Sequence, residues 1–169
     1  GDARETPAAK GMGGGTIRVS GGAGIFAGSG MSGGSLRIDG NCGDFLGAPI
    51  PGERQGMRGG LIEVRGDAGD RAGDRLRRGI ILIAGKAGDY CASRMIAGTI
   101  ACLGGAGVQA GLAMRRGTLL LGSAPALPPS FNDNGLQDLG FLALLTAALR
   151  HLDPPFSELH GRGTRVHRW

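Results

Sequence analysis

The nine-residue phrase "GMGGGTIRV" at residues 11–19 recurs as "GMSGGSLRI" at 30–38 and as "GMRGGLIEV" at 56–64. The methionine position of this phrase is occupied in turn by Met12, Met31, Met57, Leu76, Met95 and Met114, at spacings of 19, 26, 19, 19 and 19 residues. The longer interval contains an insertion, "PIPGERQ" at 49–55, which is rich in proline and charge. A short fixed period with one inserted loop indicates a solenoid.

Each repeat unit has the same internal order. Three residues after the methionine position stands a glycine, at Gly15, Gly34, Gly60, Gly79, Gly98 and Gly117. A run of alternating apolar residues follows, such as "TIRVS" at 16–20, which is typical of a strand with one buried face. Nineteen residues are too few for a strand and a full helix, and the glycines would break a helix. The sequence therefore predicts a right-handed parallel β-helix of about six 19-residue coils over residues 1–122.

The chain changes character after the last repeat. Residues 123–135 form a predicted Pro-rich linker, and residues 136–152 carry leucines at helical spacing. We expect this C-terminal helix to pack on the outer face of the last coils, centred on Leu82, Ala101 and Leu120, because an exposed apolar sheet face needs a cover. Residues 153–169 form a basic tail.

Composition excludes several classes of protein. The net charge is +5, with Lys10 and Lys86 as the only lysines, and aromatic residues make up 4% of the chain. Nucleic-acid binding is not predicted, because no aromatic side chains interleave with the basic ones as a stacking platform for bases. No apolar run reaches the ~18 residues of a membrane span. Three cysteines without a CxxC pair suggest neither disulfides nor zinc, and a cytoplasmic location is expected.

Two columns of charge follow from the repeat. Asp44, Asp70 and Asp89 occupy one position in three successive coils. They could bind a cation such as Ca²⁺, or they could cap N–H groups of the turns and pair with arginines such as Arg71, Arg75 or Arg94; capping is the preferred interpretation. In a second column Arg58, Arg77 and Arg115 are expected to stack at one position of the repeat, with Arg78 and Arg116 beside them. Either a polyanion site or a subunit interface is a candidate role for these arginines, with the interface or simple solvation preferred.

The sequence predicts no catalytic residue, no metal ligand and no directly bound cofactor. The three histidines lie in the tail at separations that match no helical metal pair, and no nucleophile–base pair is visible. The motif residues are assigned to the structural repeat: Met12, Gly15, Met31, Gly34, Met57, Gly60, Gly79, Met95, Gly98, Met114 and Gly117.

The Gly-x-x-Gly and Gly-x-x-Gly-Asp phrases at 19-residue spacing resemble the GXGXG β-helix family. That family includes the C-terminal domain of the large subunit of glutamate synthase and the β-helical subunit of formylmethanofuran dehydrogenase. The repeated methionine and the closing segment "PPSFNDNGLQDLGFLALLTAALRHL" at 128–152 favour the second relative. The resemblance covers about residues 11–160. The Arg-rich, Lys-poor composition favours its bacterial members, in which the β-helical subunit belongs to the formyltransferase/hydrolase complex of methylotrophs.

The resemblance implies a scaffold subunit in one-carbon metabolism. Its implied partners are amidohydrolase-like, formyltransferase and molybdopterin-enzyme-like subunits, which carry the metals and the catalytic residues. A methanofuran-type cofactor is implied for the complex and not for this chain, onto which no family catalytic residue is transferred. The alternative is a β-helical structural domain of a glutamate synthase-like amidotransferase.

Overall fold

The computed structural model describes residues 7–123, 126–159 and 164–168. The chain divides into two compact units, Gly1–Leu127 and Pro128–Trp169, and each is described by itself.

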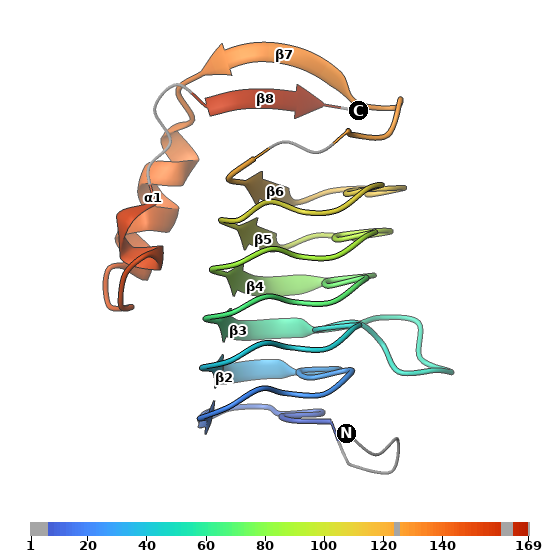
Figure 1. The fold of residues 1–169 in the computed structure, drawn as a ribbon, viewed down its shortest axis with the longest axis vertical. Helices are drawn as coiled ribbons and strands as arrows, with labels where there is room; N and C mark the ends of the chain where they lie inside the picture. Colours follow the sequence, from blue (N-terminus) through green and yellow to red (C-terminus); the bar gives the residue numbers. More distant parts are fainter. Residues whose placement is uncertain (1–6, 124–125, 160–163, 169) are drawn as a thin grey trace. The chain divides into compact units, whose positions relative to one another are not determined.

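The first unit is a solenoid built around one parallel sheet. Its six strands stack in sequence order, and they are β1 (Thr16–Val19), β2 (Ser32–Ile38), β3 (Arg58–Val64), β4 (Arg78–Ile83), β5 (Thr99–Cys102) and β6 (Thr118–Leu121). Each strand pairs with the next at one coil's distance, as in Ile62 with Ile81 and Ile81 with Ile100. Figure 1 shows these strands as successive rungs. The predicted parallel solenoid of about six coils is confirmed.

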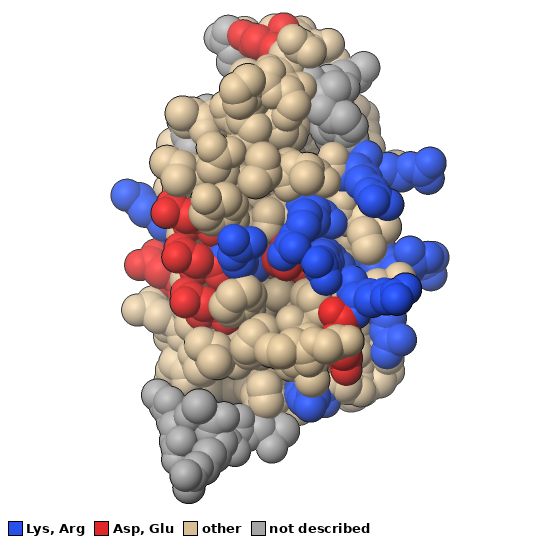
Figure 2. Space-filling model, turned by 90° about the vertical axis from the view of Figure 1, so that its right-hand side faces the viewer, with Lys and Arg blue, Asp and Glu red and all other residues tan. Residues whose placement is uncertain are grey.

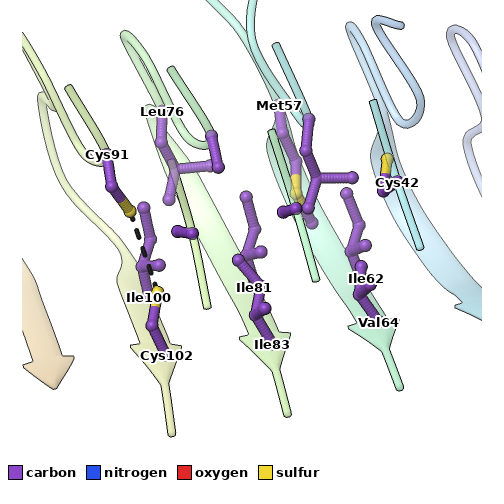
Figure 3. Packing of buried hydrophobic residues seen from close by; sticks show 14 of the residues in the cluster. Cys42, Met57, Ile62, Val64, Leu76, Ile81, Ile83, Cys91, Ile100 and Cys102 are labelled. Carbon is purple, nitrogen blue, oxygen red and sulfur yellow. Dashed lines mark hydrogen bonds between the residues drawn. The ribbon is translucent and has the colours of Figure 1, made fainter. Parts of the chain in front are cut away.

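The core fills the interior of the coils. In the central coils the alternating residues of the strands are fully buried, among them Leu36, Ile62, Ile81 and Ile100. Figure 3 shows Ile62, Ile81 and Ile100 in successive coils. A second inward position pairs small residues across the coils, in the order Ala23, Cys42, Ala68, Ala87 and Ala106. Small side chains there keep each coil narrow enough for the strand residues to fill it.

The methionine and glycine of the repeat have separate structural roles. Met31, Met57, Leu76 and Met95 are fully buried. The glycine three residues later has a positive φ in every coil, for example +93° at Gly60 and +109° at Gly79. At Gly60 a Cβ atom would lie 2.7 Å from the carbonyl oxygen of Gly34 in the preceding coil. The position therefore requires glycine for both its backbone angle and its close approach.

The insertion at 49–55 interrupts one turn only. It leaves the solenoid between β2 and β3 and projects from it as a loop (Figure 1). Pairing resumes at once, since Ser32 pairs with Gly59 and Leu36 with Ile62, with a register irregularity between Ser32 and Ser35. The extra residues thus change one corner without shifting the inward face of the strand.

The second unit differs from the prediction in its elements. Strand β7 (Asn132–Gln137) pairs antiparallel with β8 (Thr164–Arg168), and between them lie helix α1 (Gly140–Leu149) and the 3₁₀ helix η1 (Phe156–Glu158). The prediction of a helix over 136–152 was therefore wrong at both ends. Residues 136 and 137 belong to β7, which also takes the end of the predicted linker, and part of the basic tail forms η1 and β8.

The apolar face of α1 explains why a helix forms at all. Leu142, Leu145 and Leu149 recur at helical spacing and are buried. Docking of this helix on Leu82, Ala101 and Leu120 remains a prediction. Among the residues that the structure describes, no helix has the length and apolar character required to cross a bilayer.

Candidate functional site

The predicted arginine column lies at the corner where strands begin. Arg58 is the first residue of β3 and Arg78 the first of β4, and the two are register partners in the sheet. The predicted stacking of Arg58 with Arg77 is therefore wrong by one residue, because the register shifts between Arg58 and Leu61. Arg78 lies two residues before Ile80, which pairs with Thr99, and Thr99 pairs with Thr118. The residues two before Thr99 and Thr118 are Ala97 and Arg116, so these hold the position of Arg78 in the next two coils. Arg77 and Arg115 immediately precede Arg78 and Arg116 in the chain. We call Arg58, Arg77, Arg78, Arg115 and Arg116 the arginine ladder; all five are exposed.

The ladder is uncompensated within the described part of the chain. Some arginines outside the ladder have carboxylate partners: Arg18 and Arg37 lie 2.8 and 2.9 Å from the oxygens of Asp39, and Arg94 lies 2.6 Å from Asp74. No such ion pair joins a ladder arginine to any acidic residue that the structure describes. Like charges on paired strands oppose folding, so these positions are not explained by the stability of the solenoid.

The insertion loop adds a hollow beside the ladder. Glu53, Arg54 and Gln55 of the loop and Arg58 of the ladder line a surface hollow of about 300 Å³. Figure 2 shows basic side chains gathered along one side of this face, with acidic side chains beside them. Sequence reasoning did not find the hollow, because the approach of 53–55 to Arg58 depends on the conformation of the loop. The charged residues at the end of an insertion were the available signal.

The acidic column links successive coils through the backbone. The amide of Asp70 donates to Asp44 Oδ1 at 2.8 Å, that of Asp89 to Asp70 Oδ1 at 2.8 Å, and that of Val108 to Asp89 Oδ1 at 2.9 Å. Asn41 and Asp67 accept amides of the next coil in the same way. The predicted capping of turn N–H groups is confirmed, and each bond joins two successive coils.

The predicted pairing of this column with arginines is wrong. Arg94 binds Asp74 through two hydrogen bonds of 3.0 and 2.6 Å, and Arg71 lies over the ring of Tyr90, 4.6 Å from its centroid. Asp74 is buried and also accepts a hydrogen bond from Ser93 Oγ at 2.7 Å, so its charge is satisfied by two partners from the next coil. Within the residues described, no group of three or more potential ligands is arranged to hold a metal ion.

A column of flat side chains adjoins the acidic one. Phe26, Phe45, Arg71, Tyr90 and Gln109 hold one corner position, each with φ between 57° and 62°. The rings of Phe26 and Phe45 stack with their centroids 4.8 Å apart. Other residues of these turns, including Arg75 and Arg94, also have a positive φ. The positive φ is therefore a property of the turn and does not by itself indicate a functional site.

The cysteines are buried in the interior. Burial raises the pKa of Cys42 to about 12. The Sγ atoms of Cys91 and Cys102 lie 3.8 Å apart (Figure 3), and their hydrogen bond, together with burial, raises the pKa of Cys102. Thiols held protonated in this way are poor nucleophiles and poor metal ligands.

The structure thus has an exposed row of arginines and a repeated corner. Comparison with known proteins shows which proteins the chain resembles. No protein-family model matches the sequence, and no curated protein matches it. Among solved structures, the chain is similar to a chain in the crystal structure of the formyltransferase/hydrolase complex (FhcABCD) from Methylorubrum extorquens in complex with methylofuran. The sequence identity is 43% and the TM-score is 0.87. The match covers 95% of this chain and 60% of the other, so the chain spans less than two thirds of that relative's length. Over nearly all of its own length, the chain is therefore similar in sequence and fold to a chain of a formyltransferase/hydrolase complex.

Proposed function

We propose that the chain is a non-catalytic scaffold, equivalent to the β-helical subunit, in a formyltransferase/hydrolase complex of one-carbon metabolism. The observation that carries the proposal is the 43% identity to a chain of such a complex over 95% of this sequence. Identity at this level, with a TM-score of 0.87, supports the same coil geometry in both chains.

The construction of the solenoid supports a scaffolding role. The buried carboxylate of Asp74 holds two coils together through its hydrogen bonds with Ser93 and Arg94. Its three thiols are buried, and the pKa is raised to about 12 at Cys42 and is also raised at Cys102. A stack of hydrogen-bonded coils is a stiff body with long exposed columns of side chains, which suits it to fix the spacing between larger partners.

The proposal assigns the chemistry to the partners. The formyltransferase and amidohydrolase-like subunits, together with one that is molybdopterin-enzyme-like, carry out the reaction on a methanofuran-type cofactor. This chain binds none of the cofactor's reacting atoms.

Reconstitution tests this assignment. The partner subunits of a formyltransferase/hydrolase complex are purified and mixed with or without this chain, and particle mass and formyl transfer to methylofuran are measured. We expect full assembly and full activity only with the chain present, and no turnover by the chain alone. Assembly and activity that are independent of the chain would disprove the scaffold role. Turnover by the isolated chain would disprove its non-catalytic nature.

A further inference from the structure

We propose that the arginine ladder is the docking site for an acidic α-helix of a partner subunit, which lies along the solenoid axis and places its carboxylates against successive coils. The inference rests on the proposed function in one respect, namely that the partner is another subunit of the complex.

The first argument is the charge. Arg58 and Arg78 are register partners and exposed, and no ion pair joins either to an acidic residue in the described ranges. Arg54 lines the same hollow as Arg58, together with the acidic Glu53, which forms no ion pair with either arginine. The chain does pair its arginines elsewhere, as at Asp39 and Asp74. A row of like charges that the fold itself leaves unneutralised fits a partner of opposite charge.

The second argument is the spacing. Adjacent strands of a sheet lie about 4.8 Å apart, so the backbones of the register partners Arg58 and Arg78 lie at about that interval. Side chains three or four residues apart on a helix are about 5–6 Å apart, whereas neighbours on one face of an extended strand are about 6.7 Å apart. A helix therefore matches the ladder better than an extended chain does.

The gap in the ladder extends the match. Ala97 replaces arginine in one coil, so Arg116 lies two coils, or about 9.6 Å, beyond Arg78. At about 1.5 Å per residue this distance corresponds to six or seven residues of helix. The predicted partner helix thus has one carboxylate that faces Arg58 and a second, three or four residues along the helix, that faces Arg78. A third carboxylate, six or seven residues further on, faces Arg116. Arg77 and Arg115 lie beside this line.

Carboxylate cross-linking measures the spacing of the partner's carboxylates directly. Arg58, Arg78 and Arg116 are replaced singly by lysine in the assembled complex, and a zero-length carbodiimide joins each new amine to the carboxylate that contacts it. The chain has only two natural lysines, Lys10 and Lys86, so few competing products arise. Mass spectrometry then identifies the partner residue bonded to each of the three positions.

The proposal requires all three cross-links to fall on one partner segment. The residue bonded at position 78 is expected about three or four residues from that bonded at 58, and the residue bonded at 116 about six or seven further on. Two-residue steps would show an extended strand and overturn the helix. A cross-linked small polycarboxylate would show a ligand site and overturn the partner protein. No cross-link at any ladder position in an assembled complex would overturn the docking site itself.

Charge reversal supplies the second measurement. Arg78→Glu is expected to weaken association of the partner about tenfold or more and to reduce its dependence on salt. The control is Lys86→Glu, which makes the same charge change at an exposed position on another corner, and we expect about a twofold change or less. Equal effects of the two variants would contradict the proposal. If the unmodified chain joins no complex, the proposed function fails as well; if it joins one that tolerates Arg78→Glu, only the ladder inference fails.

Discussion

At the scale of single residues, the glycine that precedes each strand is required by its surroundings. Gly60 has a φ of +93°, and an added Cβ would lie 2.7 Å from a backbone oxygen of the preceding coil. Neither the angle nor the backbone neighbour can relax without moving a coil. Any side chain at this position is consequently expected to destabilise the stacking of the coils.

Replacement of this glycine should destabilise the solenoid strongly. We expect Gly60→Ala to lower the free energy of unfolding by about 2–3 kcal/mol. The matched control is Gly14→Ala, since Gly14 belongs to the same phrase but has open space around its Cβ position and no positive φ. Urea denaturation of both variants checks the difference, and an equal loss in the two would contradict the steric explanation.

Thiol ionisation should couple stability to alkaline pH. An unfolded cysteine has a pKa of about 8.5, whereas burial raises the pKa of Cys42 to about 12. Above pH ~8.5 the unfolded chain releases protons that the folded chain keeps, so the free energy of unfolding falls as pH rises toward 12. Urea titrations between pH 8 and 10 should show this fall.

The control for the thiol effect is available in the repeat itself. Cys42→Ala places alanine where Ala23 and Ala68 stand in neighbouring coils. This variant should fold and should lose less stability over the same pH range. An identical pH dependence in the variant would show that Cys42 does not contribute.

At the scale of elements, the acidic column acts as a ladder of acceptors between coils. Asp70 accepts the amide of Asp89, as Asn41 accepts that of Asp67. Only the side-chain oxygen is required for this bond, and the charge is not. The column therefore needs no cation to explain its presence.

Paired substitutions separate the bond from the charge. Asp70→Ala removes the acceptor and should cost about 1 kcal/mol of stability. Asp70→Asn keeps an oxygen acceptor and should stay within about 0.5 kcal/mol of the parent. Thermal unfolding with and without Ca²⁺ completes the test, and stabilisation by Ca²⁺ that Asp70→Asn abolishes would restore the cation-site interpretation.

The residues found at the methionine position of the repeat predict which substitutions of Met57 the fold tolerates. Leu76 fills in one coil the buried position that Met57 and Met95 fill in others. Met57→Leu should consequently cost less than about 1.5 kcal/mol, whereas Met57→Ala should cost about 2–5 kcal/mol by leaving a cavity. Denaturant midpoints check the order, and similar losses for both variants would show that this position does not depend on filled volume.

The solenoid was predictable because the sequence pattern of each strand and corner recurs several times, and because each strand pairs with the equivalent strand of the next coil. The sequence of the second unit has no such repeat, and its leucine spacing predicted a helix that was too long. Leucines at 136 and 139 share the helical spacing of Leu142 and Leu145, yet Leu136 is 70% exposed in β7 and pairs with Arg165 of β8. That pairing joins residues far apart in the sequence and overrides the local periodicity.

The candidate surface was predictable to a similar degree. The repeat allowed an arginine column to be inferred, but it aligned Arg58 with Arg77. The structure pairs Arg58 with Arg78, because the register shifts between Arg58 and Leu61 at the start of β3. The partner of Arg94 could not, because Asp74 occupies its site only in one coil and the sequence offered other carboxylates nearby. The hollow at Arg54 depends on an insertion with no second copy.

At the scale of the whole molecule, the solenoid is a stiff body whose charged columns face outward. In the proposed assembly, carboxylates of a partner subunit neutralise the arginine ladder.

Native mass spectrometry of the complex purified through a tag on this chain tests the central claim most directly. We predict a single assembly in which the 17.1 kDa chain is present in fixed stoichiometry with formyltransferase and amidohydrolase-like subunits. A stable chain that purifies without these subunits, from cells that express them, would contradict the account.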